Sequence, residues 1–225
     1  VYISYPFCAQ KCTYCNFASG VFPKDLEPAY QSRLLEEIRS SSWSWTPETV
    51  YLGGGTPSLW PLEDLAEVLR AIPGKPWREA TMEASPGTLT AERVSAWRNL
   101  GINRVSLGAQ SFVDGEIRRT GRKHSAAIIS SDVALLRSQG IHSINIDLIA
   151  GLAGQTAASW RQSVDCVLEL APPHVSVYIL EVDEDSRLGA EVLLNGQRYG
   201  ARDIPSEEEQ VAFYLCLLYT SDAAD

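Results

Sequence analysis

The sequence predicts an α/β fold in which short parallel strands alternate with longer helices. Six runs of strand-forming residues alternate with segments whose apolar residues recur at helical spacing. The cysteines, glycine runs and isolated carboxylates follow strands rather than helices. Such alternation is typical of a parallel sheet or barrel, and six units of this size favour a partial barrel.

The composition is that of an ordinary globular protein. The 225 residues allow one large domain, and 45% of them are hydrophobic and 21% charged. A net charge of -9 without a block of Lys or Arg argues against nucleic acid as the main partner. No apolar run approaches transmembrane length, no segment reads as a secretory signal, and clustered thiols suit a reducing compartment. We therefore expect a cytoplasmic protein that does not span a membrane.

Two strand–helix units are expected first. A strand at residues 1–6 ends at a cysteine-rich loop, and a helix with one apolar face follows at 25–40. A second strand at 49–52 runs into a glycine-rich loop. The helix after it is expected at 61–72, where leucines form one stripe.

The third and fourth units have clear helix boundaries. After a strand at 79–84, Thr90 is expected to cap a helix that Gly101 ends. After a strand at 103–109, Ser125 is expected to cap the next helix.

The last two strands are expected at 143–149 and 174–180, with a helix ending at Leu170 between them. The inner face of that helix is expected to hold Trp160, Val164, Val167 and Leu168.

Residues capable of chemistry lie at or just after the carboxyl end of every expected strand. They are the cysteine loop, the glycine run, Glu83, Gln110, Asp147 and Glu181. Because parallel barrels carry their sites at this end of the strands, we expect these residues to share one site.

Three of the five cysteines, Cys8, Cys12 and Cys15, fall within eight residues at C-x3-C-x2-C spacing. A closed zinc site and an ordinary iron–sulfur carrier each use four ligands. Three thiolates would leave one iron of a [4Fe–4S] cluster open to a small molecule, and the positive charge of Lys11 favours the thiolate form of the cysteines.

The alternative is a zinc site with a distant fourth ligand. The candidates for that ligand, none in a short ligand motif, are Cys166, Cys216, His124, His142 and His174. Aromatic side chains that could shield the loop from water are Phe7, Tyr14 and Phe17.

The run Gly53-Gly54-Gly55-Thr56-Pro57 lets the backbone approach a ligand closely and adopt positive φ. The alternative is a flexible turn, but a rigid Thr-Pro follows directly. The spacing is neither that of a Walker loop nor that of a dinucleotide fingerprint.

Two carboxylates, Glu83 and Asp147, stand in apolar strands, where an unpaired charge is costly. Glu83 could meet ligand hydroxyls or an internal Arg or Lys. Asp147 could serve a ligand or act as a structural hydrogen-bond acceptor.

The cysteine spacing, with Tyr14 before the third cysteine, resembles the cluster loop of radical S-adenosylmethionine (SAM) enzymes. Residues 2–8 look like the oxygen-independent coproporphyrinogen III oxidase-like family, and the likeness continues to about position 215. It implies an open, TIM-like (βα)6 partial barrel over residues 1–205, with a [4Fe–4S] cluster on the three cysteines and bound SAM.

The resemblance also implies roles for single residues. Gly54, Gly55 and Thr56 would meet the amino group of SAM, Glu83 its ribose, and Asp147 the nucleotide site. The full set of implied cofactor-binding residues is Tyr2, Tyr14, Gly54, Gly55, Thr56, Glu83, Gln110, Arg122 and Asp147. Without the resemblance, Arg122 would be read as a surface arginine and Tyr2 as a core residue. Glu181 is the weakest match, and Ser85 and Ala153 stand where the family commonly has Asn and Pro.

Two functions compete within this family: a haem chaperone that binds SAM, and a coproporphyrinogen III oxidase of porphyrin biosynthesis. True oxidases carry a further cysteine where Phe17 stands, and Arg122-Lys123-His124 resembles an R-x-H motif of the chaperones. We favour the chaperone, with haem or porphyrin, an electron donor and a haem acceptor protein as partners.

The His-Asn-x-x-Tyr-Trp motif of the chaperone branch does not occur in the chain. We expect residues 206–215 to begin a truncated C-terminal region, and residues 216–225, which depart from the family, to be a non-native tail.

Overall fold

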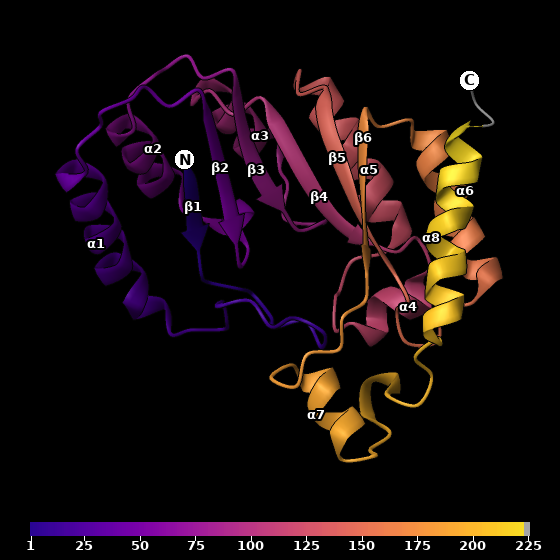
Figure 1. The fold of residues 1–225 in the computed structure, drawn as a ribbon. Helices are drawn as coiled ribbons and strands as arrows, with labels where there is room; N and C mark the ends of the chain where they lie inside the picture. The colour runs from indigo at the N-terminus through magenta and orange to yellow at the C-terminus, as the bar shows by residue number, and fades with distance from the viewer. Residues whose placement is uncertain (223–225) are drawn as a thin grey trace.

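The computed structural model describes residues 1–222. Six parallel strands form one sheet whose spatial order is the order of the sequence, from β1 to β6 (Figure 1). The strands are β1 (Tyr2–Tyr5), β2 (Thr49–Gly54), β3 (Glu79–Ala84), β4 (Arg104–Gln110), β5 (Ser143–Ala150) and β6 (His174–Ile179). Among the described residues β6 does not pair with β1, so the barrel is open, which confirms the predicted fold class.

Helices follow the strands, and most of them flank the sheet (Figure 1). They are α1 (Glu27–Ser40), α2 (Leu62–Ala71), α3 (Ala91–Asn99), α4 (Asp114–Arg119), α5 (Ala126–Ser138), α6 (Ala157–Leu170), α7 (Arg187–Leu193) and α8 (Glu207–Asp222). Helix α8 lies beside α6 at the β6 edge of the sheet. It continues past residue 216, where the sequence analysis places the start of a non-native tail. Residues 223–225 of that tail lie outside the described residues.

Alternate residues of each strand differ in character, and this separates the two faces of the sheet. In β4, Val105, Leu107 and Ala109 are completely buried, whereas Ser106 and Gly108 fall on the opposite face. The same alternation places apolar residues of β2, β3 and β5 against the helices. The residues left for the inner face are mainly polar: Tyr2, Ser4, Tyr51, Thr81, Glu83, Ser106, Asn145, Asp147, Ser176 and Tyr178.

The helix-facing core is anchored by three fully buried tryptophans. Trp60, Trp97 and Trp160 are each at most 2% exposed. Trp160 on α6 stacks on Phe213 of α8, with ring centroids 6.2 Å apart, and its indole N–H donates to the Phe213 carbonyl at 2.6 Å. This contact attaches the C-terminal helix to the sheet.

Several local expectations need correction. Ser125 precedes α5, but its side chain makes no capping hydrogen bond; the Asp114 carboxylate accepts from the Ala126 N–H instead, at 3.0 Å. Leu168 was expected on the inner face of α6 but is 46% exposed, because it lies one position past the buried stripe.

Thr90 caps α3 as predicted, accepting from the Arg93 N–H at 3.2 Å. In the part of the chain that the structure describes, no helix combines the length and apolar character needed to cross a membrane.

The tryptophan contact gives a stability prediction. Trp160→Phe removes the indole N–H that donates to the buried Phe213 carbonyl, whereas Trp97→Phe removes an indole N–H that has no hydrogen-bond partner among the described residues. We expect Trp160→Phe to lower the free energy of unfolding by about 1–3 kcal/mol more than Trp97→Phe, as measured by urea denaturation. Equal losses would show that the hydrogen bond contributes nothing.

Candidate functional site

A cavity of about 580 Å³ opens at the carboxyl ends of the strands. This volume is typical of a site for a small molecule or cofactor. All of the predicted site residues except Tyr2 line the cavity, as does Glu181. The expectation that residues following six strands share one site therefore holds in the structure.

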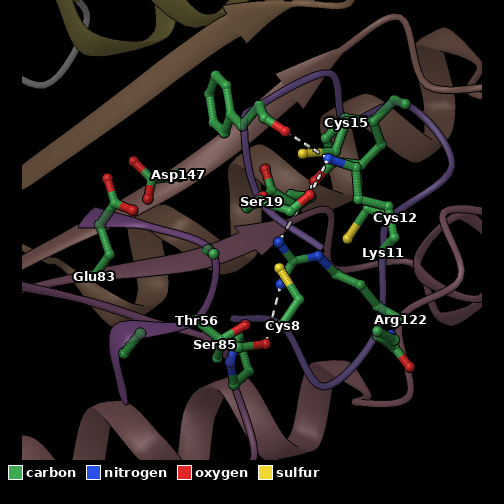
Figure 2. A pocket seen from close by; sticks show the side chains of 18 of the residues that line it. Cys8, Lys11, Cys12, Cys15, Ser19, Thr56, Glu83, Ser85, Arg122 and Asp147 are labelled. Atoms are coloured by element: carbon green, nitrogen blue, oxygen red, sulfur yellow. Dashed lines mark hydrogen bonds between the residues drawn. The ribbon is translucent and has the colours of Figure 1, made fainter. Parts of the chain in front are cut away.

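The three cysteines come from the loop after β1, and their side chains lie together at one end of the cavity (Figure 2). Lys11 holds this loop in shape, since its ammonium donates to the carbonyls of Phe17 and Ser19, both at 2.7 Å. Burial raises the pKa of the Cys8 thiol, and the charge of Lys11 acts in the opposite direction.

The aromatic flanks of the loop differ in exposure. Phe7 is buried, and burial raises the pKa of Tyr14 to about 12 although the neighbouring Arg122 lowers it. Phe17 lines the cavity but is 67% exposed, so the expected shielding by this ring is wrong.

The donor set does not fit a single metal ion. Among the described side chains, no group of three or more His, Cys, Asp or Glu is close enough to hold one. His124 lines the cavity, but its Nε2 faces the Ala109 carbonyl at 3.4 Å; burial, followed by the charge of Arg122, lowers its pKa to about 4. Of the candidate fourth ligands for zinc, His124 alone among the described residues lines this cavity, and it forms no metal-holding group with the thiols.

The glycine loop is clamped against the cysteine loop. Gly54 adopts φ +110°, and the amides of Gly55 and Thr56 donate to the carbonyls of Tyr5 and Phe7 at 2.7 and 2.9 Å. A Cβ on Gly55 would stand 2.7 Å from the Phe7 carbonyl oxygen and 2.9 Å from the Cys8 sulfur. Glycine is therefore required here for close approach.

Glu83 at the end of β3 is held by two donors. The Tyr51 hydroxyl donates to Oε1 at 2.9 Å and the Gly54 N–H to Oε2 at 3.1 Å. Burial nevertheless raises the pKa of Glu83; these two hydrogen bonds lower it, and the nearby Asp147 raises it. No Arg or Lys pairs with this carboxyl group in the described part of the chain, so the predicted alternative of an internal ion pair is not found.

Asp147 lies beside Glu83 across the sheet (Figure 2). It accepts from the Ser106 hydroxyl at 2.8 Å and from the Asn145 amide at 2.7 Å. Burial again raises its pKa, and the hydrogen bonds lower it. Two carboxyl groups at one cavity wall make that wall a strong acceptor for hydroxyl or ammonium groups.

The opposite wall is basic. Arg122 reaches the Ser85 hydroxyl at 3.2 Å and the Tyr14 hydroxyl at 3.5 Å, while its buried Nε has no hydrogen-bond partner among the described residues. Gln110 stands beside it with φ +68°, at a register shift between β4 and β5. A non-glycine residue with positive φ is strained, and such strain concentrates at functional sites.

Tyr2 does not reach the cavity. It is 61% exposed on the inner face of β1 and stacks on Tyr51, with ring centroids 5.7 Å apart. Its position at the start of its strand, away from the carboxyl end, explains the distance from the site. It is not a core residue either.

Sequence reasoning missed the residues that hold the two carboxylates. Tyr51, Ser106 and Asn145 are polar side chains at alternate positions of their strands, on the same face as Glu83 and Asp147. This alternation along the strands was the sequence signal that could have identified them as neighbours of the two carboxylates. Asn145 also accepts from Ser176 at 3.2 Å, which links β5 to β6.

Comparison with known proteins gives consistent results. Residues 2–167 match the radical SAM superfamily. The chain is 36% identical over 198 residues to the heme chaperone HemW of Haemophilus influenzae, covering 83% of this chain and 52% of that protein. It is 38% identical over 187 residues to an oxygen-independent coproporphyrinogen III oxidase of Bradyrhizobium diazoefficiens, covering 79% of this chain and 42% of that protein.

Among solved structures, coproporphyrinogen III oxidase (HemN) from Escherichia coli superposes with a TM-score of 0.80 at 23% identity, over 99% of this chain and 51% of that one. This likeness concerns the fold. The chain spans about half the length of the curated relatives it matches.

The raised pKa of Glu83 predicts a pH-dependent stability. Below the unfolded-state pKa of about 4.3 the group is protonated in both states, and as pH rises through the higher folded-state pKa, ionisation favours unfolding. Glu83→Gln mimics the protonated form, and the Tyr51 hydroxyl can accept from its amide. We therefore expect Glu83→Gln to be more stable than the unsubstituted protein at pH 7 without ligand, and equal to it near pH 4.

Urea unfolding at several pH values measures this difference. Glu184→Gln, at an exposed loop position, controls for the loss of one negative charge. A Glu83→Gln variant that is less stable at pH 7 would mean that the two hydrogen bonds outweigh burial of the charge.

Proposed function

Because the chain belongs to the radical SAM superfamily, we propose that its three loop thiols hold a [4Fe–4S] cluster, that its cavity binds SAM, and that the protein is a haem chaperone. The observation that carries the proposal is the meeting of three thiols, a backbone-only glycine loop and two hydrogen-bonded carboxylates at one cavity. With three protein ligands, one iron stays open to a small molecule. When bound, the cluster and SAM supply one-electron chemistry that protein side chains lack.

The cavity residues fit SAM by their chemistry. Gly54, Gly55 and Thr56 expose backbone to the methionine end of the cofactor, next to Cys8. Glu83 and Asp147 offer carboxylate oxygens to ribose hydroxyl groups and to the nucleotide. The buried, unpartnered Nε of Arg122 offers a donor to a carboxylate group.

Two features support the chaperone over the oxidase. Phe17 stands where oxidases of the family carry a further cysteine, and several curated relatives at 30–36% identity are named as heme chaperones. The alternative, an oxygen-independent coproporphyrinogen III oxidase, is supported by the Bradyrhizobium diazoefficiens relative. For either function we propose haem or porphyrin and an electron donor as partners, and a location in the cytoplasm. The chaperone also requires a haem acceptor protein.

The two functions are separated by one experiment. The protein is reconstituted anaerobically with iron and sulfide, both as this chain and as a chimera in which residues 1–205 are followed by the C-terminal half of the Haemophilus influenzae relative. Each is incubated with SAM, dithionite and coproporphyrinogen III, and titrated separately with haem. Haem binding by the chimera without loss of coproporphyrinogen is expected; conversion to protoporphyrinogen would overturn the chaperone assignment and establish the oxidase.

The thiol loop makes a direct prediction about metal content. Reconstituted protein should contain about four iron atoms per chain, with an oxygen-sensitive visible absorption. Cys12→Ala removes one of three ligands and should abolish that absorption. Cys166→Ala, which removes a half-buried thiol of α6, should leave it unchanged. Retention of the full iron content by Cys12→Ala would contradict the proposed ligand set.

The glycine loop makes a second prediction. In Gly55→Ala the new methyl group would meet the Phe7 carbonyl and the Cys8 sulfur, so either the thiol loop or the glycine loop must move. We expect at least a tenfold loss of affinity for SAM, roughly 1.4 kcal/mol, measured by equilibrium dialysis of the reconstituted protein. Gly115→Ala, whose Cβ would have no neighbour within 4 Å, is the matched control. Unchanged affinity in Gly55→Ala would refute the role of the loop.

A further inference from the structure

A second cavity, of about 430 Å³, lies against the thiol loop and is basic. Four of its lining residues are basic: Lys11, Arg118, Arg119 and Arg187. The ammonium group of Lys11 turns toward Phe17 and Ser19, which line the thiol cavity, so the three arginines supply the charge of the basic cavity. None of the described residues that line it is acidic. The cavity therefore gathers positive charge on a chain whose net charge is -9.

The thiol loop is the shared wall of the two cavities. Ala9, Gln10 and Lys11 line both the basic cavity and the cavity that holds the three thiols. A partner seated in the basic cavity is therefore separated from the thiols by a single stretch of chain between Cys8 and Cys12.

The outer side of this loop is fixed to the fold by hydrogen bonds. The Thr13 N–H donates to the Thr120 carbonyl at 3.0 Å, and the Leu188 N–H donates to the Thr13 carbonyl at 2.8 Å. The Gln10 amide donates to the Gly121 carbonyl, and the Arg187 guanidinium to the Lys11 carbonyl. The loop thus connects the end of α4 to the start of α7, which lie next to each other below the sheet (Figure 1).

The positive charges of the basic cavity are not neutralised by carboxylates. None of the ion pairs between described residues involves its four basic side chains. Lys11, Arg119 and Arg187 donate to carbonyl oxygens, and Arg187 also stands 5.5 Å from the ring centre of Tyr199. Neutral partners orient these groups and leave their charge available to a ligand.

We propose that the basic cavity docks an acidic one-electron carrier protein, of the small ferredoxin class, that reduces the metal group on the thiol loop. The inference rests on the proposed function, which requires an electron from outside. One electron leaves the reduced carrier and is delivered through the loop, and no covalent bond forms or breaks. Charge complementarity selects the partner, since acidic proteins are repelled by the rest of this acidic chain and attracted here.

Charge reversal of Arg118 tests the docking. This side chain is exposed in the last turn of α4 and lies in the basic cavity; Arg70→Glu, at an exposed position in the last turn of α2, makes the same change of charge at the same place in a helix. The full reconstituted chain is mixed anaerobically with a reduced, strongly acidic [2Fe–2S] ferredoxin, and bleaching of its visible absorption is followed by stopped flow. Reduced methyl viologen, a small cation, serves as the second reductant.

We expect Arg118→Glu to slow reduction by the ferredoxin about tenfold at low ionic strength, with the difference from Arg70→Glu vanishing at high salt. Reduction by methyl viologen should be unaffected in both variants.

Equal rates of reduction by the ferredoxin in the two variants would overturn the docking site, while the proposed function would stand. Weakened haem binding in Arg118→Glu with normal ferredoxin rates would assign the cavity to tetrapyrrole carboxylates. Absence of bleaching by methyl viologen in the unsubstituted chain would overturn the proposed function itself.

Discussion

The two faces of the parallel sheet must meet different surroundings, and the rest of the structure depends on this constraint. Strands β1 to β5 bury their apolar residues against the helices, where Val105, Leu107 and Ile146 are wholly enclosed. Strict alternation then puts the intervening polar residues on the inner face. An open six-stranded sheet does not fill its interior with apolar layers as a closed barrel does, so a cavity remains. Glu83 and Asp147 face the cavity because they alternate along β3 and β5 with the apolar residues that are buried against the helices.

Holding two carboxyl groups at one wall has an energetic cost that neighbouring donors only partly offset. Tyr51, Gly54, Ser106 and Asn145 all donate to them, yet burial still raises both pKa values. The Nε of Arg122 on the far wall has no hydrogen-bond partner among the described residues. These groups are partly satisfied within the protein, and a ligand with hydroxyl and carboxylate groups would complete their hydrogen bonds. The loops that carry the thiols and the glycines are meanwhile clamped to each other and to α4 and α7, which pre-organises the site.

Local patterns in the sequence were sufficient for the strands, most helices and the convergence of the site residues. Residues 79–84 and the Thr90 cap are correct to the residue, because turn and capping signals are short-range. The short helix α4 and the role of Asp114 at α5 were missed, since they depend on contacts between segments. Leu168 was placed wrongly because helical spacing of apolar residues shows the direction of the buried face but not how far that face extends around the helix. Tyr51 and Asn145 were overlooked because their importance lies in partners on neighbouring strands, and the basic cavity joins segments more than a hundred residues apart in the sequence.

The central claim is that the thiol loop, the glycine loop and the carboxylate wall together place SAM against an open metal position. The most direct measurement is electron paramagnetic resonance of the reduced, reconstituted chain, with and without SAM labelled with 17O in its carboxylate group. The account predicts that adding SAM changes the spectrum and that the label shows hyperfine coupling to the electron spin, because SAM held by the glycine loop would bring its methionine end next to the thiol loop. An unchanged spectrum at saturating SAM, with no coupling, would contradict it.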